Sequence, residues 1–557
     1  MSNKSIELGK TKNRNTVSIF PKTRETHMQI LGATGEGKSK IMENMIRQDI
    51  ANNEGVCLLD PHGYLYNDIV RWCETKHMLD RSSPKKIILF DPSEEEWTFG
   101  FNPLRLASAE ISFHVDAMVK AVAQVWGGED QDKTPLLKRC LRILFHALVE
   151  KGLSLYEAQH LIDPVDEEVR KYITRDIADV SIKKQWNYFN SLKPKPFYDD
   201  FGSSISRMME FLASPIIRNI VGQIEKTIDF RKIMDEGWIL LVNLSPGDSV
   251  SDANARLLGT LIINDLFMKA RGRPKKSRPF YLYVDECGLF INEDIGRILS
   301  EGRKFGLHLT LASQNLAQLK DAGERVYRAV MQNAKTKVVF GGLDPEEAEI
   351  LAKQLFLGEF DLEEEKKILS KPVVVNYIKS WLESYSKSKG SVVGGGHSSG
   401  VIDGPAAGRD KWSETDSISS SDTETETYGR HESLEPILKE RPGGVFDLQE
   451  QIYKAMDLMV NQPEQHAIIK LPKKHTKFVK TPFVEDGFAN DDRVRRFKEK
   501  SYNLTNFANP KKLAEAEIEK RQRLLLKNAQ DNKDDYVQKP TKTKRISDGA
   551  EKKTRKR

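Results

Sequence analysis

Short apolar runs alternate with amphipathic stretches over the first hundred residues of the chain. One apolar run ends at Leu31, and a Gly-rich turn then leads into a segment whose apolar residues, from Ile41 on, recur at helical spacing. Two further apolar runs, Gly55–Asp60 and Lys86–Asp91, each follow after about one helix length. Strands that alternate with helices in this way predict an α/β fold, in which helices cover both faces of a mainly parallel sheet.

The alternation stops near Leu104. Between residues 105 and 230 apolar residues recur at intervals of three and four, so we expect an all-helical domain inserted into the α/β domain. Runs rich in β-branched and aliphatic residues then return. They predict four more buried strands, at Trp238–Leu244, Phe280–Glu286, Leu307–Gln314 and Thr336–Gly342.

The composition changes again in the last third of the chain. Residues 384–431 are dominated by Ser, Gly, Thr and acidic residues. Such a segment buries too little apolar area to offset its ordering entropy, so we expect a disordered linker there. The predicted organisation is an N-terminal extension (1–26), an α/β core (27–104 and 231–383), the helical insert (105–230), the linker (384–431), a C-terminal completion of the core (432–485) and a basic, partly helical or disordered tail (486–557).

The Gly-rich turn carries the first candidate chemistry. It reads Gly32, Ala33, Thr34, Gly35, Glu36, Gly37, Lys38, Ser39 and fits the phosphate-loop pattern G-x-x-x-x-G-K-[ST]. Glycines let the backbone N–H groups converge on phosphates at the start of a helix. We expect Lys38 to reach the β- and γ-phosphates of a bound nucleotide and Ser39 to ligate Mg²⁺. The alternative, a turn with an incidental lysine, is disfavoured because a strand and a helix flank the motif.

Two acidic residues end the strand predicted at 280–286. Asp285 suits a Mg²⁺ partner, and Glu286 suits the base that orients the attacking water. The carboxyl ends of strands are where open α/β sheets bind ligands. The alternative is that both carboxylates cap the next helix, where acids are favoured.

Gln314 and Arg303 flank the next predicted strand. Gln314 ends it, where an amide can contact both the γ-phosphate and the water and report the state of the nucleotide. Arg303 precedes it, and is either a surface residue or an arginine finger supplied to a neighbour's site.

Charge and composition exclude several classes of protein. The chain has 87 Lys and Arg against 81 Asp and Glu, a net charge of +6, but residues 493–557 alone carry +12, which leaves −6 for residues 1–492. A globally basic DNA-coating protein is therefore excluded. No apolar stretch approaches the roughly 20 residues of a membrane helix, and the N-terminus lacks the apolar core of a signal peptide. Four cysteines without a CxxC pair form neither a disulfide framework nor a zinc site, so we expect a cytoplasmic, reduced protein.

Taken together, the motifs resemble those of the HerA/FtsK superfamily of hexameric ATPases, and most closely those of TraG-like conjugative coupling proteins of type IV secretion systems. The resemblance covers roughly residues 27–383 and 432–485. The motifs that carry it, in order, are GATGEGKS, LLDPHG, FNPL, SPIIRNIVGQ, ILLVNLSPG with NARLLGTLI, YLYVDE and ILSEGRKFGLHLTLASQ.

The resemblance implies a RecA-like core with an inserted helical domain, assembled as a homohexamer that moves DNA with ATP and Mg²⁺. It assigns nucleotide and Mg²⁺ binding to Lys38 and Ser39, and the Walker B pair to Asp285 and Glu286. It makes Gln314 the sensor and Arg303 the finger acting in trans. Only about 30 residues precede Gly32, which leaves no room for the transmembrane helices of membrane-anchored relatives or the β-barrel of HerA proteins.

Three functions follow from these observations. The first is an ATP-driven DNA translocase that delivers DNA to a conjugative or secretion apparatus. Its expected partners are relaxosome or secretion-channel proteins and a separate membrane subunit that recruits it to the inner face of the membrane. The second is a HerA-like motor working with a nuclease in repair or phage defence. The third is a nucleotide-switched scaffold that gathers substrates without moving DNA.

Overall fold

A computed structural model of the chain describes residues 4–80, 85–106, 110–127, 135–247, 250–291, 295–356, 359, 372–388, 397–402, 411–416, 425–440 and 448–537. It divides into two units, residues 1–351 with 459–557 and residues 352–458. The strands between residues 372 and 440 are described by their backbone alone.

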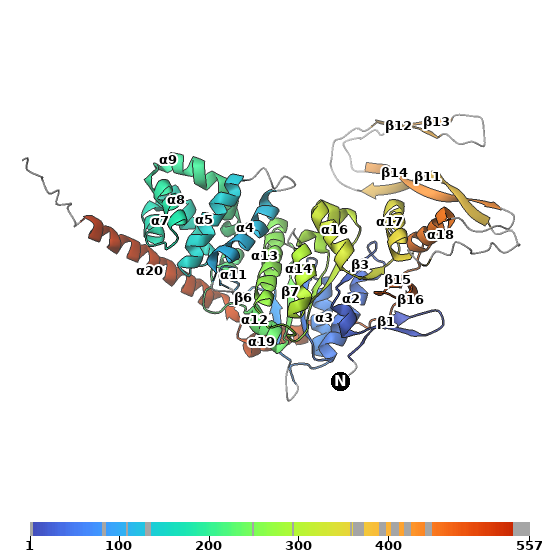
Figure 1. Cartoon of the computed structure of the whole chain (residues 1–557), viewed down its shortest axis with the longest axis horizontal. Helices are drawn as coiled ribbons and strands as arrows, with labels where there is room; N and C mark the ends of the chain where they lie inside the picture. The colour runs from blue at the N-terminus through green and yellow to red at the C-terminus, as the bar shows by residue number, and fades with distance from the viewer. Residues whose placement is uncertain are drawn as a thin grey trace, which may run out of the picture. The chain divides into compact units, whose positions relative to one another are not determined.

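The first unit is built on an 11-stranded sheet in the order β2-β1-β16-β15-β10-β3-β9-β8-β4-β7-β5 (Figure 1). The seven strands from β10 to β5 are parallel. They are β3 (Met28–Leu31), β4 (Gly55–Asp60), β5 (Ile87–Phe90), β7 (Ile239–Asn243), β8 (Phe280–Val284), β9 (Leu307–Ser313) and β10 (Thr336–Val339). Each coincides with an apolar run of the sequence, and all their residues are buried, as expected for strands covered on both faces. The expected α/β fold with a mainly parallel sheet is confirmed.

Four antiparallel strands extend the sheet beyond β10. They are β1 (Ile6–Lys10), β2 (Thr16–Ile19), β15 (His466–Lys470) and β16 (Lys477–Lys480). β15 and β16 fall inside the segment predicted to complete the core. β1 and β2 fall inside the predicted N-terminal extension, which is therefore part of the sheet, because Ile6, Leu8, Val17 and Ile19 are all buried.

Helices cover both faces of the sheet. They are α1 (Pro21–Arg24), α2 (Lys38–Ala51), α3 (Tyr64–Thr75), α12 (Phe230–Glu236), α13 (Asp252–Arg271), α14 (Ile295–Glu301), α15 (Ala317–Asp321), α16 (Glu324–Asn333) and α17 (Pro345–Phe356), which crosses into the second unit. The longest, α13, buries residues on most of its circumference, so it is an interior helix rather than a surface one.

The regular secondary structure of the predicted insert is helical among its described residues, apart from one isolated β-bridge between Thr227 and Gly100. It contains α4 (Ile111–Gly127), α5 (Pro135–Glu150), α6 (Ala158–Ile162), α7 (Glu167–Thr174), α8 (Val180–Ser191), α9 (Pro194–Phe197), α10 (Ser206–Ala213) and α11 (Pro215–Val221). Aromatic rings form its centre. Phe201 packs against Trp186 and Phe189 with ring centroids 5.2 and 5.0 Å apart, and the Trp186 indole donates to the carbonyl of Ile143 at 3.2 Å. A hydrogen bond at the indole and close ring packing fix this apolar centre.

The predicted basic tail is an integral part of the first unit up to residue 537. α19 (Asp491–Thr505) lies on β5, where Ser501 donates to the carbonyl of Ile87 at 2.5 Å. β17 (Ala508–Pro510) pairs with β6 (Trp97–Phe99), and α20 (Lys511–Val537) then follows the inserted helices (Figure 1). Its Arg521 pairs with the buried Glu157 at 2.9 Å. Most residues of these two helices are polar or charged, which is why the sequence predicts a tail here, although each helix buries one stripe of its surface.

The second unit contains two antiparallel strand pairs. β11 (Pro372–Ser388) pairs with β14 (Thr425–Glu440), and β12 (His397–Ile402) pairs with β13 (Lys411–Asp416). Helix α18 (Leu448–Val460) is the last element of this unit along the chain. Parts of these strands fall within the predicted linker at 384–431, and the remainder of that linker lies outside the described residues, as do residues 538–557 of the tail.

Candidate functional site

The phosphate loop connects β3 to α2 and takes a shape that requires its glycines. Gly32, Gly35 and Gly37 have φ values of 153°, 91° and 115°, a region that other residues rarely adopt. A Cβ atom on Gly32 would lie 2.5 Å from the Cβ of Phe340, so this position has no room for a side chain. Gly37 directly precedes the first residue of α2. The loop therefore ends at a helix N-terminus, which is a favourable place for phosphates.

Lys38 lies inside this loop. Its side chain is buried, and the ammonium group donates to the carbonyls of Gly32 at 2.7 Å and Ala33 at 3.0 Å. Burial lowers the pKa of Lys38, although the nearby Glu286, Asp285 and Glu36 act in the opposite direction. Lys38 is thus held at the loop by bonds that phosphate oxygens can replace. The shape of the loop and this cation fit a nucleoside triphosphate.

Asp285 and Glu286 directly follow β8 and are almost completely buried. The Ser39 hydroxyl donates to Asp285 Oδ2 across 3.5 Å, which joins the loop to the acidic pair. Burial, together with the charges of Asp60 and Glu286, raises the pKa of Asp285 to about 6. A hydroxyl and a carboxylate facing each other are oxygen donors of the kind that Mg²⁺ takes beside nucleotide phosphates. Ser39 and Asp285 therefore fit the expected metal role.

Glu286 has a strained backbone and a partly free carboxylate. Its φ and ψ are 41° and 55°, the left-handed region that costs a non-glycine residue about 1–3 kcal/mol. Gln314 Nε2 donates to Glu286 Oε1 at 3.0 Å, while the buried Oε2 has no hydrogen-bond partner among the described residues. One oxygen is therefore fixed and the other is left to accept a proton or a water. The structure thus brings the predicted base and the predicted sensor into direct contact.

Arg303 lies away from this group of residues. It is in a short 3₁₀ turn before β9, whereas Gln314 follows the other end of the same strand. Seven strand residues separate the two edges of the sheet by about 20 Å. The Arg303 side chain is 57% exposed and pairs with Glu25 at 3.1 Å. Arg303 therefore cannot act in the site of its own chain, and its role in a neighbour's site stays a prediction.

Sequence reasoning did not assign a role to Asp60. It ends β4, the strand next to β8, and its two oxygens accept from the backbone N–H groups of His62 at 2.9 Å and Tyr66 at 2.8 Å. Its charge is one cause of the raised pKa of Asp285. The signal was present in the sequence, because Asp60 ends a buried strand in the same manner as Asp285.

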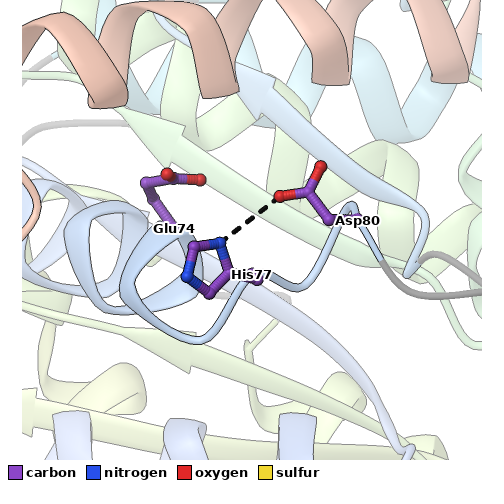
Figure 2. Close-up of side chains that lie close together, drawn as sticks. All are labelled: Glu74, His77 and Asp80. Atoms are coloured by element: carbon purple, nitrogen blue, oxygen red, sulfur yellow. Dashed lines mark ion pairs between the residues drawn. The ribbon is translucent and has the colours of Figure 1, made fainter.

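A second group of possible metal ligands lies near the end of α3. Glu74, His77 and Asp80 bring one ligand atom each within 4.8 Å of one another, and His77 pairs with Asp80 at 3.4 Å (Figure 2). Both carboxylates already have cationic partners on α19, because Glu74 pairs with Arg493 at 3.0 Å and Asp80 with Lys500. We therefore assign this group to the contact between α3 and α19.

Known families match successive parts of the chain. The model for the central domain of helicase HerA matches residues 6–237, and the model for the TraM recognition site of TraD and TraG matches residues 279–391. A probable DNA double-strand break repair helicase HerA of Methanocaldococcus jannaschii is 22% identical over 388 residues, which are 62% of this chain and 69% of the relative. The resemblance that the sequence motifs predicted is thereby confirmed.

Two solved structures are similar to this chain in fold. The bacterial conjugative coupling protein TrwBdeltaN70 has a TM-score of 0.49 at 13% identity, with 88% of this chain and 91% of that chain covered. The VirB4 protein of Thermoanaerobacter pseudethanolicus has a TM-score of 0.45 at 12% identity, with 86% and 96% covered. No helix within the described part of the chain has the length and apolar character needed to cross a membrane.

Proposed function

We propose that this chain, a TraG-like protein of the HerA/FtsK superfamily, is a Mg²⁺-dependent ATPase that works as a ring-shaped motor and moves DNA. The observation that carries the proposal is the meeting of Ser39, Asp285, Glu286 and Gln314 at the carboxyl edge of three adjacent strands. A phosphate loop alone binds nucleotide. A loop joined to a metal-binding carboxylate, and a base held by a second polar residue, are the parts that hydrolysis needs.

Each residue has a separate task in this proposal. The backbone of residues 32–39 and Lys38 bind the phosphates, and Ser39 with Asp285 holds Mg²⁺, which supplies charge neutralisation at the phosphate oxygens. Glu286 orients the attacking water and accepts its proton at Oε2, the oxygen without a partner. Gln314 keeps the other oxygen in place, so the free one points in a fixed direction.

The proposed assembly is a homohexamer in which Arg303 of one chain completes the site of the next. The exposure of Arg303 and its distance from its own site support this, because a finger at this position can reach only the site of another chain. DNA is proposed to pass through the ring, held by electrostatic contacts that weaken steeply with salt. We further propose that relaxosome or secretion-channel proteins bind the helical insert, and that a membrane subunit recruits the ring to the inner face of the membrane.

The test is ATP hydrolysis by the purified chain with and without DNA at low salt, using single- and double-stranded polymers separately. We expect Mg²⁺-dependent hydrolysis that rises on addition of DNA and is lost in Lys38→Ala and Glu286→Gln variants. Glu286→Gln should still bind ATP, which separates the loss of chemistry from the loss of binding. Slow hydrolysis that neither single- nor double-stranded DNA stimulates, combined with tight binding of a partner protein, would favour the nucleotide-switched scaffold instead.

A second candidate is a HerA-like motor that works with a nuclease in repair or phage defence. The observation that favours it is the extent of the HerA match, which covers residues 6–237 and includes the phosphate loop. The genes beside this one distinguish the two candidates. Relaxase and secretion genes would support the conjugative motor, and a nuclease gene would support the HerA-like one.

A further inference from the structure

The segment that joins β16 to α19, residues 481–490, runs beside the phosphate loop. At its start Thr481 donates to the carbonyl of Gln465 twice, from its backbone N–H at 2.8 Å and from its hydroxyl at 3.0 Å. The backbone N–H of Gln465 in turn donates to the carbonyl of Glu36, within the loop, at 3.3 Å. One end of the segment is therefore tied to the loop through a single intervening residue.

The middle of the segment is tied to the helix that follows the loop. Asp486 pairs at 3.3 Å with Lys40, the residue directly after Ser39, and the carbonyl of Glu485 accepts from Arg47 at 2.6 Å. The segment thus passes alongside the loop from Glu36 to Lys40.

Phe483 lies between these two attachments and its ring is exposed. The residue is 80% exposed, although Thr481 and Val484 on either side of it are buried, so the backbone is held while the ring faces solvent. The exposed ring therefore stands on an anchored stretch of backbone near the phosphate loop. It is a ready stacking surface for a flat ligand group.

The sheet order determines which part of a nucleotide would reach this ring. Asp285, Glu286 and Gln314 follow β8 and β9, on one side of β3, so the γ-phosphate end of a bound nucleotide faces that side. β10, β15 and β16 lie on the other side of β3, and residues 481–490 follow β16. The ribose and base of a bound nucleotide, which leave from the opposite end of the phosphate chain, would therefore extend toward the side of β3 on which Phe483 lies.

We propose that Phe483 is the stacking platform for the base of the bound nucleotide. The inference rests on the proposed nucleotide site and adds how the base is held. Stacking on a phenyl ring suits every base, so this contact gives affinity with little discrimination between ATP and GTP. Removing such a ring typically weakens binding about 5- to 150-fold.

The chain supplies a matched control on the same segment. Phe488 is also 80% exposed, but it lies beyond Asp486, next to Ala489, whose N–H donates to Thr75 at the end of α3. Phe488→Ala therefore removes an equally exposed ring from the part of the segment whose backbone is attached to α3.

The experiment measures dissociation constants for MgATP, MgGTP and inorganic tripolyphosphate, which carries the phosphates without a base. We expect Phe483→Ala to weaken both nucleotides within the stated range and to leave tripolyphosphate binding unchanged. Phe483→Trp should keep nucleotide affinity, and ATP but not tripolyphosphate should quench its indole fluorescence. Phe488→Ala should match the wild type for all three ligands.

Three outcomes would overturn the inference. Wild-type nucleotide affinity in Phe483→Ala would show that Phe483 does not stack on the base. An equal loss of tripolyphosphate binding would show that the substitution disturbs the phosphate loop instead. If the wild-type chain binds neither nucleotide nor tripolyphosphate, the proposed nucleotide site itself is wrong and the inference fails with it. The tripolyphosphate measurement therefore separates failure of the base contact from failure of the site.

Discussion

Replacing Arg303 by alanine tests whether the catalytic site is completed by a second chain. The structure predicts little effect on folding, since the side chain is 57% exposed and its ion pair with Glu25, at 3.1 Å, is a surface pair worth about 0–1 kcal/mol. The effect on turnover should be far larger, because an arginine finger contributes about 10³–10⁵ to the rate of phosphoryl transfer. Glu25→Ala is the matched control, because it breaks the same ion pair and keeps the cation.

The assay compares the kcat of ATP hydrolysis with the affinity for ATP in each variant. We expect Arg303→Ala to lose turnover while it binds ATP normally, and Glu25→Ala to retain turnover. Mixing Arg303→Ala with the equally inactive Lys38→Ala should restore activity. In a randomly mixed ring about one quarter of the interfaces combine an intact loop with an intact finger. Normal turnover in Arg303→Ala, or no recovery in rings shown to be mixed, would show that Arg303 does not act in the site of a neighbouring chain.

Three further predictions concern single side chains. Burial lowers the pKa of Lys337 to about 7, so the unfolded chain binds more protons than the folded chain between pH 7 and about 10.4, and stability rises with pH there. Lys337→Met should therefore raise the free energy of unfolding by on the order of 2 kcal/mol at pH 7. A gain in stability over the wild type that does not shrink toward pH 10, measured by thermal unfolding, would contradict this. Gln314→Ala removes the donor that holds Glu286, so kcat should fall about 100-fold with little change in ATP affinity, and a change in affinity alone would assign Gln314 to binding. Gly32→Ala places a methyl group 2.5 Å from Phe340 Cβ, so equilibrium binding should show at least a tenfold loss of ATP affinity.

The parallel part of the sheet was predictable because each strand is buried on both faces. Strands such as Ile87–Phe90 are continuous apolar runs that polar loops set apart. The two N-terminal strands are short, and the half-buried polar residues Glu7 and Ser18 interrupt them, so their few apolar residues give a weak signal. The sequence predicts α19 and α20 as a tail for the same reason, because a single buried stripe is hidden among many charges.

The candidate site was predictable where one short motif contains all of its chemistry. The phosphate loop and the pair Asp285 and Glu286 are of this kind. The contact between Gln314 and Glu286 depends on two strands being neighbours, and the position of Phe483 depends on where β16 lies in the sheet. Such contacts are set by topology, which the local pattern of residues does not contain.

Displacement of streptavidin from the biotinylated end of a DNA strand measures directly whether ATP hydrolysis moves DNA. We expect release that requires ATP and Mg²⁺, that is absent with Glu286→Gln, and that weakens as salt is raised. DNA-stimulated hydrolysis without release from either single- or double-stranded DNA would show that the chain is not a DNA translocase.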